Sequence, residues 1–78
     1  MRNSKVIQSW IEHQPATNHR GTLWTDGSKL FSYRLQIGDT AGELKILKDY
    51  TAKGTHGFQS QTTSCHVGRA RVFADLVD

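Results

Sequence analysis

The sequence contains one cysteine, one proline and no long apolar run. Because Cys65 has no second cysteine to pair with, a small secreted scaffold stabilised by disulfides is excluded, and a reducing compartment is expected. No window approaches the roughly 18 apolar residues that a membrane span needs. Residues 1–14 also lack the apolar stretch and cleavage site of a signal peptide. We therefore expect a soluble, cytoplasmic protein that makes no contact with membranes.

The chain is also poor in the residues that build a core. Leu, Ile, Val and Phe account for 17 of its 78 residues, close to the floor of roughly 20% below which chains tend to stay disordered. One domain over residues 1–78 is expected, because a second core would need roughly another 50 residues. Self-association would add burial, so a structural or regulatory homodimer is an alternative interpretation.

The patterns of common catalytic and metal sites are missing as well. The four histidines and Cys65 form no close pair such as Cys-x-x-Cys or His-x-x-x-His, so no metal site is expected. Cys65 and His66 are adjacent, and helix neighbours point about 100° apart, which does not suit a thiolate and its base. The glycines match no phosphate-binding loop, and the acids are scattered. The sequence predicts a protein that is not an enzyme and needs no cofactor.

Positive charge is in modest excess, with ten Lys and Arg against seven Asp and Glu. The longest stretch of one sign is residues 50–74, which contains Lys53, Arg69 and Arg71 and no acid. Such a stretch is either a solvated loop and helix face or a basic interaction patch. The charge therefore allows an acidic partner without requiring one.

Two segments have the spacing of amphipathic helices. Over residues 4–13, the apolar side chains lie on one face of a 3.6-residue period, with Ser4 or Asn3 as N-cap and Pro15 just beyond the end. A second helix is predicted from a cap at residues 62–64 to Asp78, although Gly68 costs about 1 kcal/mol relative to Ala. Residues 51–61 between the strands and this helix are polar and predict a loop.

The middle of the chain has the pattern of antiparallel strands. Residues 22–25 precede Asp26-Gly27, a dipeptide suited to a tight hairpin turn. Residues 30–37 alternate, which predicts Phe31 and Tyr33 in the core and Arg34 on the solvent face. A second turn over residues 38–42 leads to a third strand over residues 43–51.

These elements predict an α+β fold. A three-stranded antiparallel β-meander is covered by an N-terminal and a C-terminal helix, in the order α-β-β-β-α. In this arrangement Arg34 and Lys45 are neighbours on the sheet, with the remaining candidate contact residues around its rim. The predicted contact residues for a partner or for nucleic acid are Arg34, Lys45, Lys53, Arg69 and Arg71. Trp24, Tyr33 and Phe58 are aromatic candidates for stacking on bases.

Two sequence segments resemble a group of short proteins carried by phages and mobile elements. The first is residues 25–33, Thr-Asp-Gly-Ser-Lys-Leu-Phe-Ser-Tyr, followed by Ile37; the second is residues 60–66, Ser-Gln-Thr-Thr-Ser-Cys-His. The group shows the patterns TDG..L.SY and S.TTS.H. The present chain departs from it by a longer glycine-containing loop after Tyr50.

A phage-type protein of this size is similar to anti-CRISPR proteins and other inhibitors of host defence, which act by covering a surface. The resemblance implies a non-catalytic inhibitor in the host cytoplasm that binds a host protein complex, such as a CRISPR effector. The positive charge differs from that of inhibitors that imitate DNA. The alternative hypothesis is a small basic accessory protein that binds nucleic acid, with affinity that falls steeply with salt.

Overall fold

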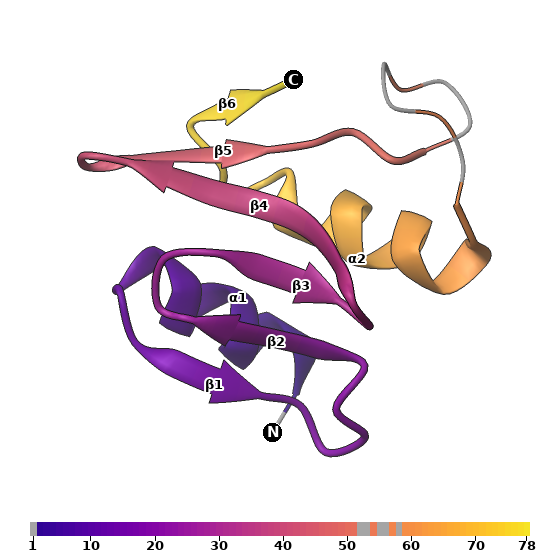
Figure 1. Cartoon of the computed structure of the whole chain (residues 1–78), viewed down its shortest axis with the longest axis horizontal. Helices are drawn as coiled ribbons and strands as arrows, with labels where there is room; N and C mark the ends of the chain where they lie inside the picture. Colours follow the sequence, from indigo (N-terminus) through magenta and orange to yellow (C-terminus); the bar gives the residue numbers. More distant parts are fainter. Residues whose placement is uncertain (1, 52–53, 55–56, 58) are drawn as a thin grey trace.

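The fold is known from a computed structural model that describes residues 2–51, 54, 57 and 59–78. Within these residues the chain forms two helices and one six-stranded sheet (Figure 1). The elements in chain order are α1 (Asn3–Ile11), β1 (Pro15–Thr17), β2 (Leu23–Asp26), β3 (Leu30–Ser32), β4 (Leu35–Ala41), β5 (Leu44–Leu47), α2 (Gln61–Ala70) and β6 (Leu76–Val77).

The strands lie in the sheet in chain order, from β1 to β6. All neighbours pair antiparallel except β5 and β6, which are parallel. The α+β class is confirmed. The predicted three-stranded meander is incomplete, because short strands add to it at both edges.

Both helices pack on the same face of the sheet. Val6, Ile7 and Trp10 of α1 and Val67 and Ala70 of α2 are fully buried. They share one core with side chains from the strands, namely Leu23, Leu30, Ile37 and Leu47. No helix of the described residues covers the opposite face, so the fold has two layers and one open sheet face.

The first predicted helix and the first hairpin are confirmed. The hairpin loop is longer than a two-residue turn, since Thr25 pairs with Leu30. The Asp26 carboxylate accepts hydrogen bonds from the backbone N–H groups of Ser28 and Lys29, and these bonds lower the pKa of Asp26. Gly27 has φ of 102°, and a Cβ there would lie 2.9 Å from the carbonyl oxygen of His13. This turn therefore requires glycine.

The predicted strand over residues 30–37 is wrong in continuity, and its phase is wrong for residues 30–33, whereas Ile37 lies in the core as expected. The chain turns at Tyr33, whose φ of 58° is left-handed, so the segment is split into β3 and β4. Leu30 and Ser32 face the core, Phe31 is half-buried on the open face, and Tyr33 is 48% exposed. The prediction that Phe31 and Tyr33 lie in the core is therefore wrong, because the turn at Tyr33 interrupts the alternation of inward and outward side chains.

The predicted second turn is misplaced by a few residues. Gly38 belongs to β4, and the chain reverses at Gly42 and Glu43, where Ala41 pairs with Leu44. The predicted strand over residues 43–51 is observed only as β5.

The predicted C-terminal helix is too long. It ends at Ala70, and Leu76 and Val77 form β6, which pairs with Ile46 and Leu47 of β5. Ser60, not residues 62–64, is its N-cap, since the Ser60 hydroxyl accepts a hydrogen bond from the N–H of Thr63. Of the predicted loop over residues 51–61, residues 52, 53, 55, 56 and 58 lie outside the described residues, and Gln61 is the first residue of α2.

Candidate functional site

The five predicted contact residues do not form one patch. Arg34 is exposed in the turn between β3 and β4, and Arg69 is exposed on α2. Arg71 is exposed just after α2, and Lys45 is buried. Lys53 lies outside the described residues. The adjacency of Arg34 and Lys45 on a solvent face is therefore wrong.

Lys45 faces the core, where it is 2% exposed. Its Nζ donates to Thr40 Oγ1 at 2.7 Å and lies 3.4 Å from both His13 Nδ1 and the carbonyl oxygen of Gly27. It also lies 5.4 Å from the centroid of the Trp10 ring, a cation–π contact. Burial lowers the pKa of Lys45. This ammonium group ties α1, the hairpin turn and β4 together and cannot reach a partner.

Arg71 is already engaged within the molecule. Its Nη2 donates to Asp49 Oδ2 at 2.6 Å. A hydrogen bond from Thr51 and the charge of Arg71 lower the pKa of Asp49. The ion pair holds the segment after β5 against the end of α2. Because the Asp49 carboxylate is so close, the charge of Arg71 is largely compensated.

Residues 25–33 and 60–66 meet in a chain of hydrogen-bonded hydroxyl groups. Ser32 Oγ from β3 lies 2.7 Å from His66 Nδ1 and 3.0 Å from Thr63 Oγ1, both on α2. The Ser60 hydroxyl donates to Thr63 Oγ1 at 3.1 Å. The donors can follow one direction, from Ser60 through Thr63 and Ser32 to an accepting His66 Nδ1.

This arrangement favours a neutral imidazole. Burial, and then the charge of Arg69, lower the pKa of His66. A serine hydroxyl beside a histidine nitrogen is the geometry of an activated nucleophile, but Ser32 is 0% and His66 2% exposed. In this conformation a substrate cannot reach Ser32, and the network attaches α2 to the sheet.

The open sheet face carries a pair of stacked aromatic rings. Thr17, Trp24, Phe31 and Gln36 are opposite one another on four successive strands and form one row across β1 to β4. The rings of Trp24 and Phe31 are 4.1 Å apart between centroids and 10° from parallel. Trp24 Nε1 donates to the carbonyl oxygen of Tyr33 at 2.8 Å, which fixes the orientation of the indole.

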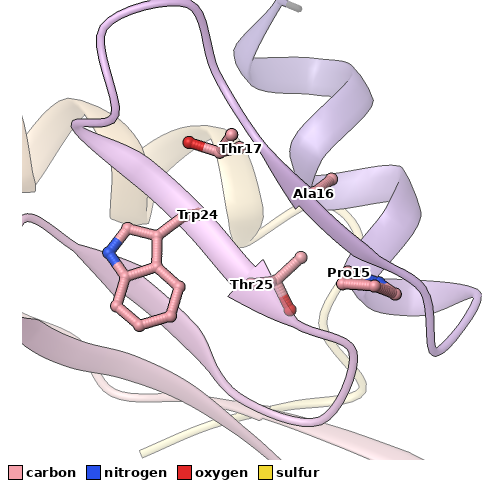
Figure 2. Close-up of a pocket in the computed structure, with 5 residues that line it drawn as sticks. All are labelled: Pro15, Ala16, Thr17, Trp24 and Thr25. Atoms are coloured by element: carbon pink, nitrogen blue, oxygen red, sulfur yellow. The ribbon is translucent and has the colours of Figure 1, made fainter.

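Trp24 borders two depressions in the surface. One of about 630 Å³ is lined by Gly21, Trp24, Tyr33 and Arg34. The other, of about 440 Å³, is lined by Pro15, Ala16, Thr17, Trp24 and Thr25. Figure 2 shows the indole extending from β2 on the side away from β1. An aromatic surface with a guanidinium group beside it can stack a planar group and hold an anion.

Hydrogen bonds gather the basic loops at the same end of the molecule. Asn18 Nδ2 donates to Asn3 Oδ1 at 2.8 Å, and Asn18 Oδ1 accepts from the N–H of Thr22. The N–H of Tyr33 donates to the carbonyl oxygen of Thr22. The start of α1, the loop between β1 and β2, and the turn that carries Arg34 are thus joined. Residues 18–25 and 27–38 contain no acid.

The stacked pair was the part of this site that the sequence interpretation missed. Trp24 and Arg34 were candidates, whereas Phe31 was placed in the core. The signal for this pair lies in the hairpin, because the turn between β2 and β3 puts Trp24 opposite Phe31. Both side chains then face away from Leu23 and Leu30.

Comparisons with protein-family models, with curated proteins and with solved structures found no match for this chain. Among the described residues, no group of three or more His, Cys, Asp or Glu side chains could hold a metal ion. Neither helix in the described part of the chain has the length and apolar character to cross a membrane.

Proposed function

We propose that this protein binds single-stranded nucleic acid through its open sheet face. We call this surface the aromatic face and define it by Trp24, Phe31, Tyr33 and Arg34; the exposed Arg20 lies in the loop between β1 and β2, next to Gly21 of the larger depression. Bases stack on aromatic side chains, and Lys and Arg hold the phosphates. Residues 18–25, which include Trp24, and residues 27–38 contain no acid, which keeps this surface attractive to a polyanion.

The observation that carries the proposal is the state of Trp24. Its ring is stacked on Phe31, fixed by a hydrogen bond to Tyr33, and bordered by two depressions, one of which includes Arg34. A large aromatic side chain that has no core role but is held in one orientation is suited to binding without further ordering. This favours the hypothesis of a nucleic-acid-binding protein over the hypothesis of an inhibitor of host defence.

A second candidate function is inhibition of a host defence complex by covering its surface, in the manner of anti-CRISPR proteins. The observation in its favour is a group of exposed apolar side chains on β5, on β6 and after α2, which we call the C-terminal patch. Its members are Leu44, Val72, Phe73, Leu76 and Val77. Exposed apolar patches of this kind mark protein interaction sites.

A binding titration separates the two candidates. Fluorescence anisotropy of labelled single-stranded DNA, single-stranded RNA and duplex DNA is measured with increasing protein at two salt concentrations. We expect single strands to bind best and Trp24→Ala to weaken their binding by roughly five- to 150-fold, since one stacked base contributes about 1–3 kcal/mol. Phe73→Ala, an exposed aromatic of the C-terminal patch, is the matched control and is expected to bind like the wild type.

Thermal unfolding of each variant shows whether a loss of affinity reflects loss of the fold. Because Trp24→Ala also removes the bond to Tyr33, Arg34→Gln provides a second test that leaves the stack intact. A wild-type protein that binds none of the three nucleic acids would overturn the proposal and favour the C-terminal patch as the functional surface.

A further inference from the structure

The depression between β1 and β2 has an open aromatic wall. Phe31 covers one face of the Trp24 indole, and among the described residues no second ring is stacked on the other face. Thr17 is the neighbour of Trp24 on β1. The depression of about 440 Å³ is lined by Pro15, Ala16, Thr17, Trp24 and Thr25 (Figure 2). Its volume falls within the range of roughly 300–1,000 Å³ typical of small-molecule sites.

We infer that this depression is a subsite for one unpaired base, which stacks on the free face of Trp24 while the adjoining phosphate contacts Arg34. The inference rests on the proposed function and deepens it by naming the position of the base. We call the depression the base slot.

The lining of the base slot suits an uncharged planar group. None of its five side chains is ionisable. The Thr25 hydroxyl is already used, since it donates to the carbonyl oxygen of Lys29 and accepts from the N–H of Gly27. Recognition therefore rests on stacking, which every base can provide, and we expect little preference among the four bases.

Charge favours a nucleotide over the other occupant that such a groove suits, a proline-rich peptide. Trp24 is shared with the neighbouring depression, where Arg34 supplies a guanidinium group. A phosphate attached to a stacked base meets this group, whereas a proline-rich segment has no anion at a fixed distance. At the far end of the base slot, Pro15 pairs with Asp26, whose carboxylate repels phosphate. The nucleic-acid backbone is thereby directed toward Arg34.

Two tyrosine substitutions in the same row of the sheet provide the test. Thr17→Tyr places a ring against the free face of Trp24 and fills the base slot. Gln36→Tyr places the same ring on the other side of the stack, against Phe31, and leaves the slot open. Both positions lie on strands, where tyrosine is well accommodated.

The probes are a thymidine 12-mer and a 12-mer of abasic nucleotides, with binding followed by anisotropy and by tryptophan fluorescence. Trp10 is fully buried, so quenching by a bound base reports on Trp24. We expect the wild type and Gln36→Tyr to bind the thymidine strand at least about fivefold more tightly than the abasic strand. Thr17→Tyr is expected to bind both strands equally weakly and to lose the quenching.

Three results would overturn the inference, and they differ in what they imply for the proposed function. Wild-type discrimination retained by Thr17→Tyr, together with loss of binding in Arg34→Gln, would remove the base slot but leave nucleic-acid binding intact. A proline-rich peptide that quenches Trp24 more strongly than either oligonucleotide would assign the slot to a peptide. Absence of binding to both strands by the wild type would reject the proposed function itself.

Discussion

A single hydroxyl, that of Ser32, joins the sheet to helix α2. It contacts both Thr63 Oγ1 and His66 Nδ1, and all three residues are buried. When His66 is neutral, its Nδ1 accepts and every hydroxyl in the chain from Ser60 has an acceptor. Protonation puts a hydrogen on Nδ1. The Ser32 hydroxyl and Nδ1 are then both donors, unless every hydrogen bond in the row reverses its direction. The network is therefore sensitive to the charge of one imidazole.

Stability should fall on acidification because of His66. Burial lowers the pKa of His66 below its ordinary value of 6.5, so the unfolded chain binds a proton in a pH range where the folded protein does not. The free energy of unfolding therefore falls as the pH decreases below about 6.5, with a slope of at most about 1.4 kcal/mol per pH unit for this group. Above that pH the contribution is fully present. Urea unfolding at several pH values between 5 and 8 measures it.

His66→Asn removes the titrating group and should flatten this pH dependence, although it lowers stability at pH 8 by about 1–3 kcal/mol through the loss of a buried hydrogen-bonding partner. His19→Asn changes an exposed histidine and is the control. Equal pH dependence in the wild type and in His66→Asn would contradict this role of His66.

At the scale of elements, helix α1 packs against β4 where Gly38 provides space. A Cβ at Gly38 would lie 2.8 Å from Trp10 Cζ2 and 3.0 Å from Leu30 Cβ. Gly38→Ala should therefore destabilise the protein by about 1–3 kcal/mol, because the indole and the strand must move apart. Thermal or urea unfolding measures the change.

Gly68 provides the matched control on α2. A Cβ at Gly68 has nothing within 4 Å, and Ala is favoured over Gly in a helix by about 1 kcal/mol. Gly68→Ala should therefore stabilise the protein. If Gly38→Ala were also stabilising, the close packing of α1 on β4 would be wrong.

Elements with a local cause could be predicted from the sequence, and elements that depend on distant pairing could not. Helix α1 follows from the spacing of Val6, Ile7 and Trp10, and the first hairpin follows from Asp26-Gly27. By contrast, Leu76 and Val77 continue the helical spacing of α2 but form β6, because β5 offers them a free edge. Tertiary pairing overrides a periodic pattern that is only weakly helical.

The same distinction between local and distant causes applies to the residues of the candidate site. Arg34 and Trp24 could be identified from their residue types and their positions in the predicted hairpin. The burial of Lys45 and the position of Phe31 on the open face could not, because they depend on the left-handed turn at Tyr33 and on the register shift in the pairing of β3 with β4. Two local irregularities of the backbone thus change which side chains are available to a partner.

At the scale of the whole molecule, charge differs between the two ends of the sheet. The antiparallel order puts the β1–β2 loop and the β3–β4 turn at one end, with Arg20 and Arg34. The β2–β3 and β4–β5 turns lie at the other end, with Asp26, Glu43 and one base, Lys29 (Figure 1). The asymmetry orients a polyanion and places its phosphates at the end that borders Trp24.

This asymmetry predicts which arginines determine the salt dependence of binding. Each phosphate contact on a single strand contributes about 0.7 to the slope of log affinity against log salt. Arg34→Gln should therefore reduce the slope by about 0.7, and the double variant Arg20→Gln, Arg34→Gln by about 1.4. Anisotropy titrations over a range of salt concentrations give the slopes.

Arg71→Gln is the control for net charge, since it removes the same single positive charge. Arg71 is paired with Asp49 at 2.6 Å and lies after α2, away from the aromatic face, so its loss should leave the slope unchanged. If the slope fell equally in Arg34→Gln and Arg71→Gln, the net charge of the protein and not the basic end of the sheet would govern binding. A loss confined to Arg20 and Arg34 would place the phosphates at the end of the sheet that carries both arginines, where Arg34 and Trp24 line one depression.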